Sequence, residues 1–108
     1  MKSLTGVRQR VTLWGRAIEI AQLEWDTNNT EHINKHNVTR LEVEESCLNQ
    51  IYVDKTYESR FLLVGRTKAG RMVSIVLAHI NKTTYYVVTA RDSSRGERKK
   101  ANEQEKSK

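Results

Sequence analysis

Residues 85–100 read YYVVTARDSSRGERKK, and this stretch decides how the chain folds. Its first part is β-branched and aromatic, which is typical of a buried strand, and the strand pattern stops at Arg91. The second part is typical of a helix start, because Ser94 and Glu97 have the three-residue spacing of a capping box. The stretch therefore predicts a strand that leads directly into a helix.

Three arginines mark this junction between strand and helix. Arg91, Arg95 and Arg98 follow one another at spacings of four and three. If the helix forms, Arg95 and Arg98 share a face near the end of the strand. Guanidinium groups that converge at a helix start bind phosphate well. The alternative for Arg91 is an ion pair with a nearby Asp or Glu. We favour phosphate, which makes nucleic acid the first partner to consider.

The segments before this stretch also have the period of strands. We expect strands at residues 60–65, 72–78 and 84–90, and a shorter apolar run at residues 51–53. The connections between the last three are short enough for hairpins, and Gly70 can supply the positive φ that such a loop needs. The second half of the chain is therefore predicted to form an antiparallel sheet.

The first half of the chain predicts one strand and two helices. Residues 17–25 alternate as a strand does. Asp26 is placed to cap a polar helix at residues 27–36. A second helix follows, and its start is marked by a capping box at Thr39 and Glu42. Together the elements give the order β-α-α-β-β-β, which is an α+β fold with an antiparallel sheet and two helices on one face.

The domain boundaries follow from the ends of these elements. We expect a single α+β domain at residues 17–98, preceded by an N-terminal arm at residues 1–16 that is either a short strand or a loose basic segment. From Arg95 onward Ala101 is the only non-polar side chain besides glycine. A helix with no apolar stripe has little to hold it on a sheet. Residues 99–108 are therefore predicted to be a disordered basic tail.

Composition and charge restrict the class of protein. The formal net charge is +6 over 108 residues, and the excess lies at the two ends of the chain. Such a balance favours polyanions, although solvated ends are the alternative. A single cysteine, Cys47, excludes an internal disulfide and a cysteine-based zinc site. No secretory signal and no membrane-spanning run is recognisable, so we expect a cytoplasmic protein.

The sequence has no motif for metal or cofactor chemistry. His32 and His36 have the spacing of zinc ligands on a helix, but no third ligand is apparent, and His79 stands alone as a weak candidate for a general base. No nucleophile elbow, no phosphate-binding glycine loop and no pair of carboxylates with the spacing of metal or glycoside chemistry is present. A chain that catalyses with cations and no metal fits one reaction class, transesterification of RNA, in which the ribose hydroxyl of the substrate is the nucleophile.

The order of five short motifs resembles the BrnT toxin family. They are LEWD at residues 23–26, NKHNV at 34–38, SRFLLVG at 59–65, GR at 70–71, and VVTAR at 87–91 followed by Arg95 and ER at 97–98. The resemblance implies a fold like that of RelE-type ribonucleases and an endonuclease that cuts RNA without a metal or other cofactor. It also implies a partner, a ribbon-helix-helix antitoxin similar to BrnA, with the toxin either a homodimer or part of a heterotetramer with that antitoxin.

The resemblance also implies where the active surface lies. Its catalytic candidates are three arginines that stabilise charge and position RNA: Arg60, Arg91 and Arg95. Further candidates for RNA binding are Lys68, Arg71, Tyr86, Arg98 and Lys99. Arg60 either joins this cluster or pairs with Glu58. Two other classes of function remain open: a non-catalytic module that binds RNA or a partner protein, and a structural protein whose basic ends are solvated.

Overall fold

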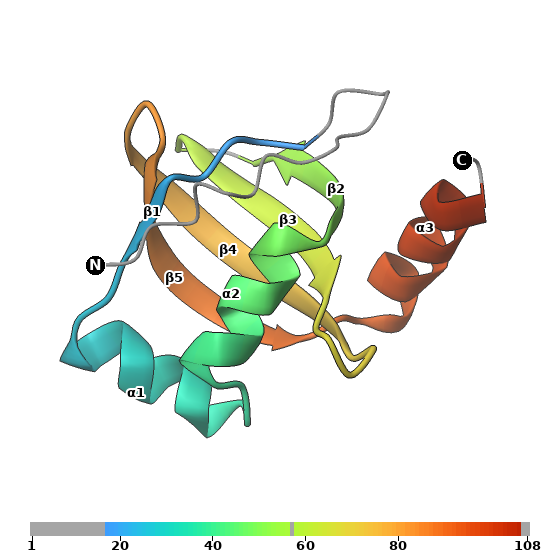
Figure 1. The fold of residues 1–108 in the computed structure, drawn as a ribbon, viewed down its shortest axis with the longest axis horizontal. Coiled ribbons are helices and arrows are strands. Elements are labelled where there is room, and N and C mark those ends of the chain that lie inside the picture. Colours follow the sequence, from blue (N-terminus) through green and yellow to red (C-terminus); the bar gives the residue numbers. More distant parts are fainter. Residues whose placement is uncertain (1–16, 57, 107–108) are drawn as a thin grey trace.

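The computed structural model describes residues 17–56 and 58–106, which form a five-stranded sheet and three helices (Figure 1). The N-terminal arm predicted for residues 1–16 lies outside the described residues. In chain order the elements are β1 (Gln22–Glu24), α1 (Thr27–Lys35), α2 (Arg40–Leu48), β2 (Gln50–Lys55), β3 (Arg60–Arg66), β4 (Met72–Asn81), β5 (Thr84–Asp92) and α3 (Arg95–Lys106).

This order differs from the predicted β-α-α-β-β-β in one strand. Residues 51–53 were expected to be only a short apolar run, whereas β2 is a full strand that pairs with β3 from Gln50 to Lys55. Four strands therefore follow the two helices instead of three. The first strand is shorter than expected, since only Gln22–Glu24 of residues 17–25 pair in the sheet.

The sheet is mixed, which corrects the expectation of a wholly antiparallel one. Its strand order is β1-β5-β4-β3-β2, and the pairs from β2 to β5 are antiparallel hairpin neighbours. The edge strand β1 instead runs parallel to β5. Parallel strands need a long crossover connection. Here that connection consists of α1, α2 and the strands β2 to β4, so the first and last strands of the chain become neighbours.

Side-chain caps determine where the first two helices begin. Asp26 accepts a hydrogen bond from the backbone N–H of Asn29 at 2.9 Å, as predicted for the cap of α1. The capping box predicted for α2 is confirmed: the Glu42 N–H donates to Thr39 Oγ1 at 3.1 Å, and the Thr39 N–H donates to Glu42 Oε1 at 3.0 Å. Each cap satisfies backbone donors that the first helical turn leaves unpaired.

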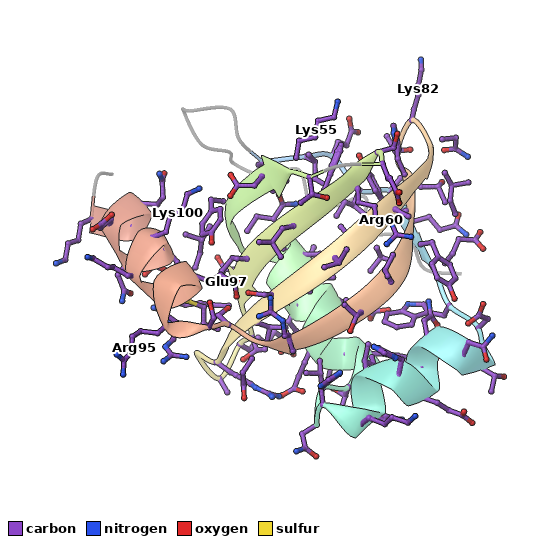
Figure 2. All side chains as sticks on the ribbon, turned by 180° about the vertical axis from the view of Figure 1, so that it is seen from behind. Lys55, Arg60, Lys82, Arg95, Glu97 and Lys100 are labelled. Atoms are coloured by element: carbon purple, nitrogen blue, oxygen red, sulfur yellow. The ribbon has the colours of Figure 1, made fainter. Side chains whose placement is uncertain are left out.

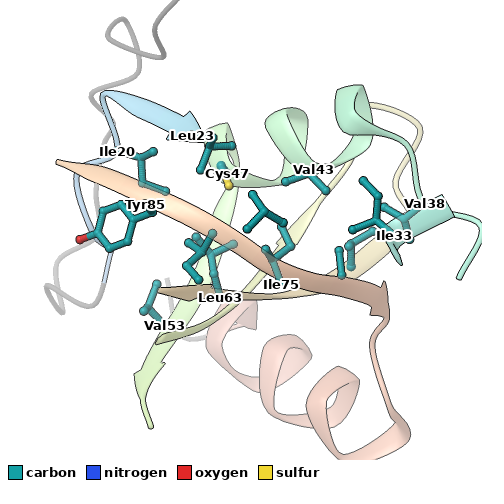
Figure 3. Packing of buried hydrophobic residues seen from close by; sticks show 14 residues of the cluster. Ile20, Leu23, Ile33, Val38, Val43, Cys47, Val53, Leu63, Ile75 and Tyr85 are labelled. Atoms are coloured by element: carbon teal, nitrogen blue, oxygen red, sulfur yellow. The ribbon is translucent and has the colours of Figure 1, made fainter. Parts of the chain in front are cut away.

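The main hydrophobic core lies between the sheet and the helices α1 and α2 (Figure 3). Its largest fully buried side chains include Ile33 of α1, Leu63 of β3 and Ile75 and Leu77 of β4. Gly65 brings the end of α2 directly against β3, because a side-chain carbon at this position would collide with the carbonyl oxygen of Ser46. The absence of a side chain there is thus part of the core packing.

A β-bulge in β5 changes which side of the sheet each residue occupies. Val87 pairs with Leu77 and Ala90 pairs with Ile75, so β5 has one residue more than β4 between these two pairs. Val87 and Ala90 are both fully buried in the main core. Strict alternation from Val87 would have placed Arg91 on the core side as well. The extra residue turns Arg91 to the opposite face.

Helix α3 packs on the side of the sheet opposite α1 and α2 (Figure 3). The disordered tail predicted for residues 99–108 is therefore replaced, as far as Lys106, by a regular helix. Ala101 is small enough to be fully buried against Tyr52, Val64 and Met72, and polar contacts along the helix supply the other attachments. None of the described helices is long and apolar enough to cross a bilayer.

Candidate nucleic-acid interface

The face of the sheet opposite α1 and α2 carries most of the predicted site residues. We call it the open face, because α3 covers only its β2 side and the end near Arg91 (Figure 2). Strand register and alternation from the buried core place on it Arg60, Leu62, Val76, Ala78, Tyr86, Thr89 and Arg91. Each of these side chains is half-buried. The open face is thus an accessible surface with an apolar middle and cations at both ends.

Arg60 and Arg91 lie on this face but do not form one cluster. Arg60 pairs with Ala78 and Arg91 pairs with Ser74. These partners are four residues apart on β4, which corresponds to roughly 13 Å along the strand. In Figure 2 Arg60 lies at the end of the sheet near Lys55 and Lys82, whereas α3 begins at the other end. The face therefore has two separate cationic positions.

The guanidinium of Arg91 is bound to a carboxylate of the same chain. Its Nη1 and Nη2 donate to Oε1 and Oε2 of Glu97 at 2.8 and 3.0 Å. Glu97 also accepts from the backbone N–H of Ser94 and from the hydroxyl of Ser74, each at 2.8 Å. The hydrogen bonds from Arg91 are the main reason that the pKa of Glu97 falls to about 2. Of the two interpretations of Arg91, the structure therefore shows the ion pair.

The other basic residues predicted at the strand–helix junction do not converge on Arg91. Arg95 is exposed at the start of α3 and is directed away from the sheet (Figure 2). Arg98 donates from Nη1 to the carbonyl oxygen of Ser93 at 2.6 Å, which closes the turn before α3. Lys99 is exposed on the same helix. The predicted capping box is confirmed, because the Glu97 N–H donates to Ser94 Oγ at 3.2 Å and Glu97 Oε1 accepts from the Ser94 N–H.

Arg60 carries the accessible charge of the open face. Within residues 17–56 and 58–106 its guanidinium makes no hydrogen bond or ion pair, so the expected alternative of a pair with Glu58 is not found. Lys82 in the β4–β5 turn is exposed at the same end of the sheet, and Lys55, which pairs with the core-packed Phe61, is exposed at that end on the side of α1 and α2 (Figure 2). We call Lys55, Arg60 and Lys82 the basic end.

Tyr86 lies across Ala78 from Arg60. Both residues pair with Ala78, so their Cα atoms are separated by two strand spacings, roughly 10 Å. The Tyr86 hydroxyl donates to the carboxylate of Asp26, 3.0 and 3.1 Å from its two oxygens. This bond holds the phenol at the β1 edge of the face. The methyl group of Ala78 leaves room between the aromatic ring and the guanidinium.

The remaining RNA-binding candidates lie at the β3–β4 hairpin. Arg71 donates to Asp92 Oδ1 at 2.8 Å, to Glu42 Oε1 at 2.9 Å and to the carbonyl oxygen of Asn37 at 2.8 Å. These bonds tie the hairpin to β5 and to the start of α2, on the side away from the open face. Lys68 is exposed in the hairpin turn. The Arg71 side chain is therefore held by hydrogen bonds within the chain, whereas Lys68 of the same hairpin is exposed to solvent.

Two residues of the site were not found by sequence reasoning. Ser74 is only 1% exposed and its hydroxyl joins Glu97, but an isolated serine within an apolar strand gives no signal of this role. Asp26 was assigned only as a helix cap, although it also holds Tyr86. His79 stacks on Tyr85 with ring centroids 4.9 Å apart, on the core side of the sheet, and is therefore not a base for the open face.

Other parts of the surface offer less defined chemistry. In the described part of the chain, no three His, Cys, Asp or Glu side chains lie close enough to hold a metal ion. A hollow of about 480 Å³ beside α1 is lined by Trp25, Asp26, Thr27, Thr30, Glu31 and Arg40. The Arg40 guanidinium lies over the Trp25 ring, 4.9 Å from its centroid, so that this cation is already engaged.

Comparison with known proteins supports the fold. No model of a protein family matches the sequence, and no curated protein matches it. Among solved structures, the fold is similar to that of the ribonuclease toxin BrnT of Brucella abortus, with a TM-score of 0.56 and 18% sequence identity. The likeness covers 68% of this chain and 97% of that chain. The chain thus has a BrnT-like fold, as the order of its sequence motifs suggested.

Proposed function

We propose that this chain is the toxin of a type II toxin–antitoxin system and an RNA endonuclease that acts through its open face. Its fold is similar to that of a ribonuclease toxin, which supports a toxin-like function. The observation that carries the proposal is the row formed by Arg60, Ala78 and Tyr86 across three neighbouring strands. It sets a free guanidinium opposite an aromatic ring on an accessible surface.

Such a row has the chemistry to bind single-stranded RNA. A guanidinium binds phosphate oxygens through two parallel hydrogen bonds, and an aromatic ring stacks on an unpaired base. The half-buried apolar side chains of Leu62 and Val76 lie beside the row and offer further surface to a base. Lys82 in the β4–β5 turn extends the positive charge at this end of the sheet. The phosphates are thus proposed to follow the basic end while a base lies toward Tyr86.

Cleavage is proposed to occur by transesterification. The 2′-hydroxyl of the substrate attacks the neighbouring phosphorus, a bond forms between O2′ and phosphorus, and the bond from phosphorus to O5′ breaks. The proton of the 2′-hydroxyl is lost, the O5′ leaving group gains one, and the products carry a 2′,3′-cyclic phosphate and a 5′-hydroxyl. Arg60 stabilises the charge that develops on the phosphate oxygens. Arg91, once released from Glu97, is proposed to contact a phosphate on the α3 side, and Arg95, at the exposed start of α3, is proposed to contact a phosphate beyond the edge of the sheet.

The proposed function includes a protein partner. A toxin of this kind is neutralised by an antitoxin, which we propose to be a ribbon-helix-helix protein similar to BrnA, in a heterotetramer with two copies of this chain. The site of action is the cytoplasm. A small adjacent reading frame with ribbon-helix-helix character, whose product co-purifies with this chain, is the expected finding. An isolated gene with no such neighbour argues against the toxin.

A second candidate is a module that binds RNA without cutting it. The ion pair between Arg91 and Glu97 favours it, because that pair removes one of the arginines expected to stabilise the transition state. In such a binding module, the open face binds RNA through Arg60 and Tyr86 alone. The same experiment separates the two candidates.

Purified chain is incubated at low salt with end-labelled single-stranded RNA, and both bound and cleaved RNA are measured. The endonuclease produces fragments that end in a 2′,3′-cyclic phosphate, whereas the binding module retains intact RNA. Arg60→Gln is expected to weaken binding and cleavage. Arg40→Gln removes the same charge from the opposite side of the molecule and serves as the matched control. Equal effects of the two variants, or no RNA binding by wild-type chain at low salt, contradict the proposal.

A further inference from the structure

Helix α3 is attached to the sheet mainly by charge. Within the described residues, one ion pair runs from it to each of three strands: Glu97 to Arg91 of β5, Glu105 to Arg66 of β3, and Lys100 to Asp54 of β2, each at 2.8 Å. Its only buried side chain is the methyl group of Ala101. On the sheet side, α3 covers the apolar side chains of Tyr52, Val64 and Met72, which become exposed when it leaves.

The ion pairs of α3 are easily weakened, because several of their side chains are exposed to water. The Arg91 side chain is 41% exposed, and the Lys100 and Asp54 side chains are 46% and 43% exposed. Ion pairs in such settings contribute little net stability and are weakened by salt and by competing ions. A polyanion that competes for Arg66, Arg91 and Lys100 can therefore weaken the attachment of α3.

The contact at Glu97 is the exception, because it is a complete anion site. The carboxylate receives two hydrogen bonds from Arg91, one from the hydroxyl of Ser74 and one from the backbone of Ser94. Arg91 and Ser74 belong to the sheet and pair with each other across β5 and β4. A phosphate group has the same negative charge and the same acceptor oxygens as the carboxylate, and a guanidinium fork binds either one.

This anion site also lies on the path of the proposed substrate. Arg91, Thr89 and Tyr86 all belong to the open face of β5, so the site continues the surface that begins at Arg60. Leu62 and Val76 form the apolar floor between the two ends. A single strand bound at the basic end therefore runs toward the position that Glu97 now occupies.

We propose that α3 is an autoinhibitory strap whose Glu97 carboxylate fills a phosphate site made by Arg91 and Ser74, and that the RNA backbone occupies this site when α3 is released. The identity of the ligand as RNA rests on the proposed function. The inference that Glu97 fills a phosphate site does not rest on the proposed function, because it is drawn from the hydrogen bonds of Arg91 and Ser74. In this state one of the two cationic positions of the open face is closed.

The test uses the full chain and the variant Glu97→Gln. Glutamine keeps the carbonyl oxygen that accepts from Ser94 and Ser74, so the capping box is retained, but it removes the charge that holds Arg91. Glu31→Gln makes the same change of charge on α1 and is the matched control. The double variant Glu97→Gln with Arg91→Gln tests whether any gain comes from the freed guanidinium.

Two probes are measured on each protein: inorganic phosphate by its effect on the thermal midpoint, and single-stranded RNA by its affinity. Phosphate is expected to raise the midpoint of the Glu97→Gln variant and to leave wild type and Glu31→Gln unchanged. RNA is expected to bind that variant about five times more tightly than Glu31→Gln, and the double variant loses this gain. Hydrogen exchange of residues 95–106 is expected to become faster when wild-type chain binds RNA.

The outcomes test the autoinhibitory role of α3 separately from the proposed RNA function. If no protein binds RNA at low salt but phosphate still stabilises the Glu97→Gln variant through Arg91, the anion site stands and the RNA function fails. If the Glu97→Gln variant binds phosphate and RNA no better than Glu31→Gln, the contact between Glu97 and Arg91 is purely structural and the strap is overturned. Unchanged protection of α3 with RNA bound also overturns it.

Discussion

The carboxylate of Glu97 and the guanidinium of Arg91 form two parallel hydrogen bonds, at 2.8 and 3.0 Å, across the turn between the last strand and the last helix. The pair joins an element of the sheet to an element of a separate layer. Because Ser74 also donates to the same carboxylate, the contact spans β4, β5 and α3.

The stability of the fold is expected to depend on pH through Glu97. Its pKa in the folded chain is about 2, below its ordinary value of 4.5. The contribution of the pair is therefore complete above about pH 4.5 and is lost as the pH falls toward 2. We expect on the order of 1–2 kcal/mol, since the exposed side of Arg91 is screened by water. Denaturant unfolding at pH 7, 4 and 3 measures it, and parallel pH profiles for wild type and Glu97→Gln would contradict it.

Replacing Gly65 with alanine is expected to destabilise the fold by roughly 2 kcal/mol or more. The new methyl group lies 2.8 Å from the carbonyl oxygen of Asn49 and even closer to that of Ser46, and neither backbone oxygen can move without shifting α2. Gly96→Ala is the control. A methyl group there meets nothing within 4 Å, and alanine favours the helix, so its effect is within about 1 kcal/mol and stabilising. Equal unfolding midpoints for the two variants would refute this assignment.

Arg71 is expected to matter for stability and not for RNA binding. Its ion pairs with Glu42 and Asp92 hold the β3–β4 hairpin against α2 and β5, on the side away from the open face. Arg71→Gln should lower the free energy of unfolding by about 1 kcal/mol. Its affinity for single-stranded RNA should stay within twofold of that of Arg40→Gln, which loses the same charge away from the open face. A selective loss of RNA affinity would return Arg71 to the binding surface.

The salt dependence of RNA binding is expected to show how many phosphates are bound at the basic end. For single strands, each phosphate neutralised contributes about 0.7 to the slope of log K against log salt. Arg60→Gln should therefore reduce the slope by about that amount, and Lys82→Gln should do so as well if the backbone follows the β4–β5 turn. Titrations at several salt concentrations give the slopes. An unchanged slope for Arg60→Gln would mean that this guanidinium does not contact phosphate.

Cys47 is expected to report on opening of the core. It is buried, and desolvation raises its pKa above the ordinary thiol value, so that almost no thiolate exists in the folded chain at neutral pH. A thiol reagent should react with it only as fast as the chain unfolds. The rate should rise with denaturant in parallel with unfolding followed by circular dichroism. Rapid modification of native chain would contradict the packing of α2 on the sheet.

Local rules predicted the helices and hairpins well. The caps at Asp26, Thr39 and Ser94 lie where the spacing of polar residues placed them, because a cap depends only on residues within one turn. The parallel pairing of β1 with β5 was missed because it joins segments sixty residues apart. The helix at residues 99–106 was missed because its attachments reach Asp54 and Arg66, which nothing near Ala101 in the sequence reveals.

The candidate site was predicted in part for the same reason. Arg60, Tyr86 and Arg91 were selected from their strand positions, and all three share the open face. Arg60 and Arg91 lie at opposite ends of this face because of the strand register, which could not be predicted from the sequence. Glu97 was recognised as part of a cap from its spacing to Ser94. Its second bond, to Arg91, depends on how sharply the chain turns between β5 and α3.

The bulge in β5 determines on which face of the sheet the charge of Arg91 lies. It falls between Val87 and Ala90, and loss of the bulge with every residue kept would turn the guanidinium into the core. Removal of the Val88 codon would instead delete the extra residue, so that Thr89, Ala90 and Arg91 alternate regularly from Val87 and keep their present faces. A relative with this fold whose last strand is one residue shorter at this point can therefore carry arginine on the same face without a bulge, so that strand length and bulge must change together in evolution.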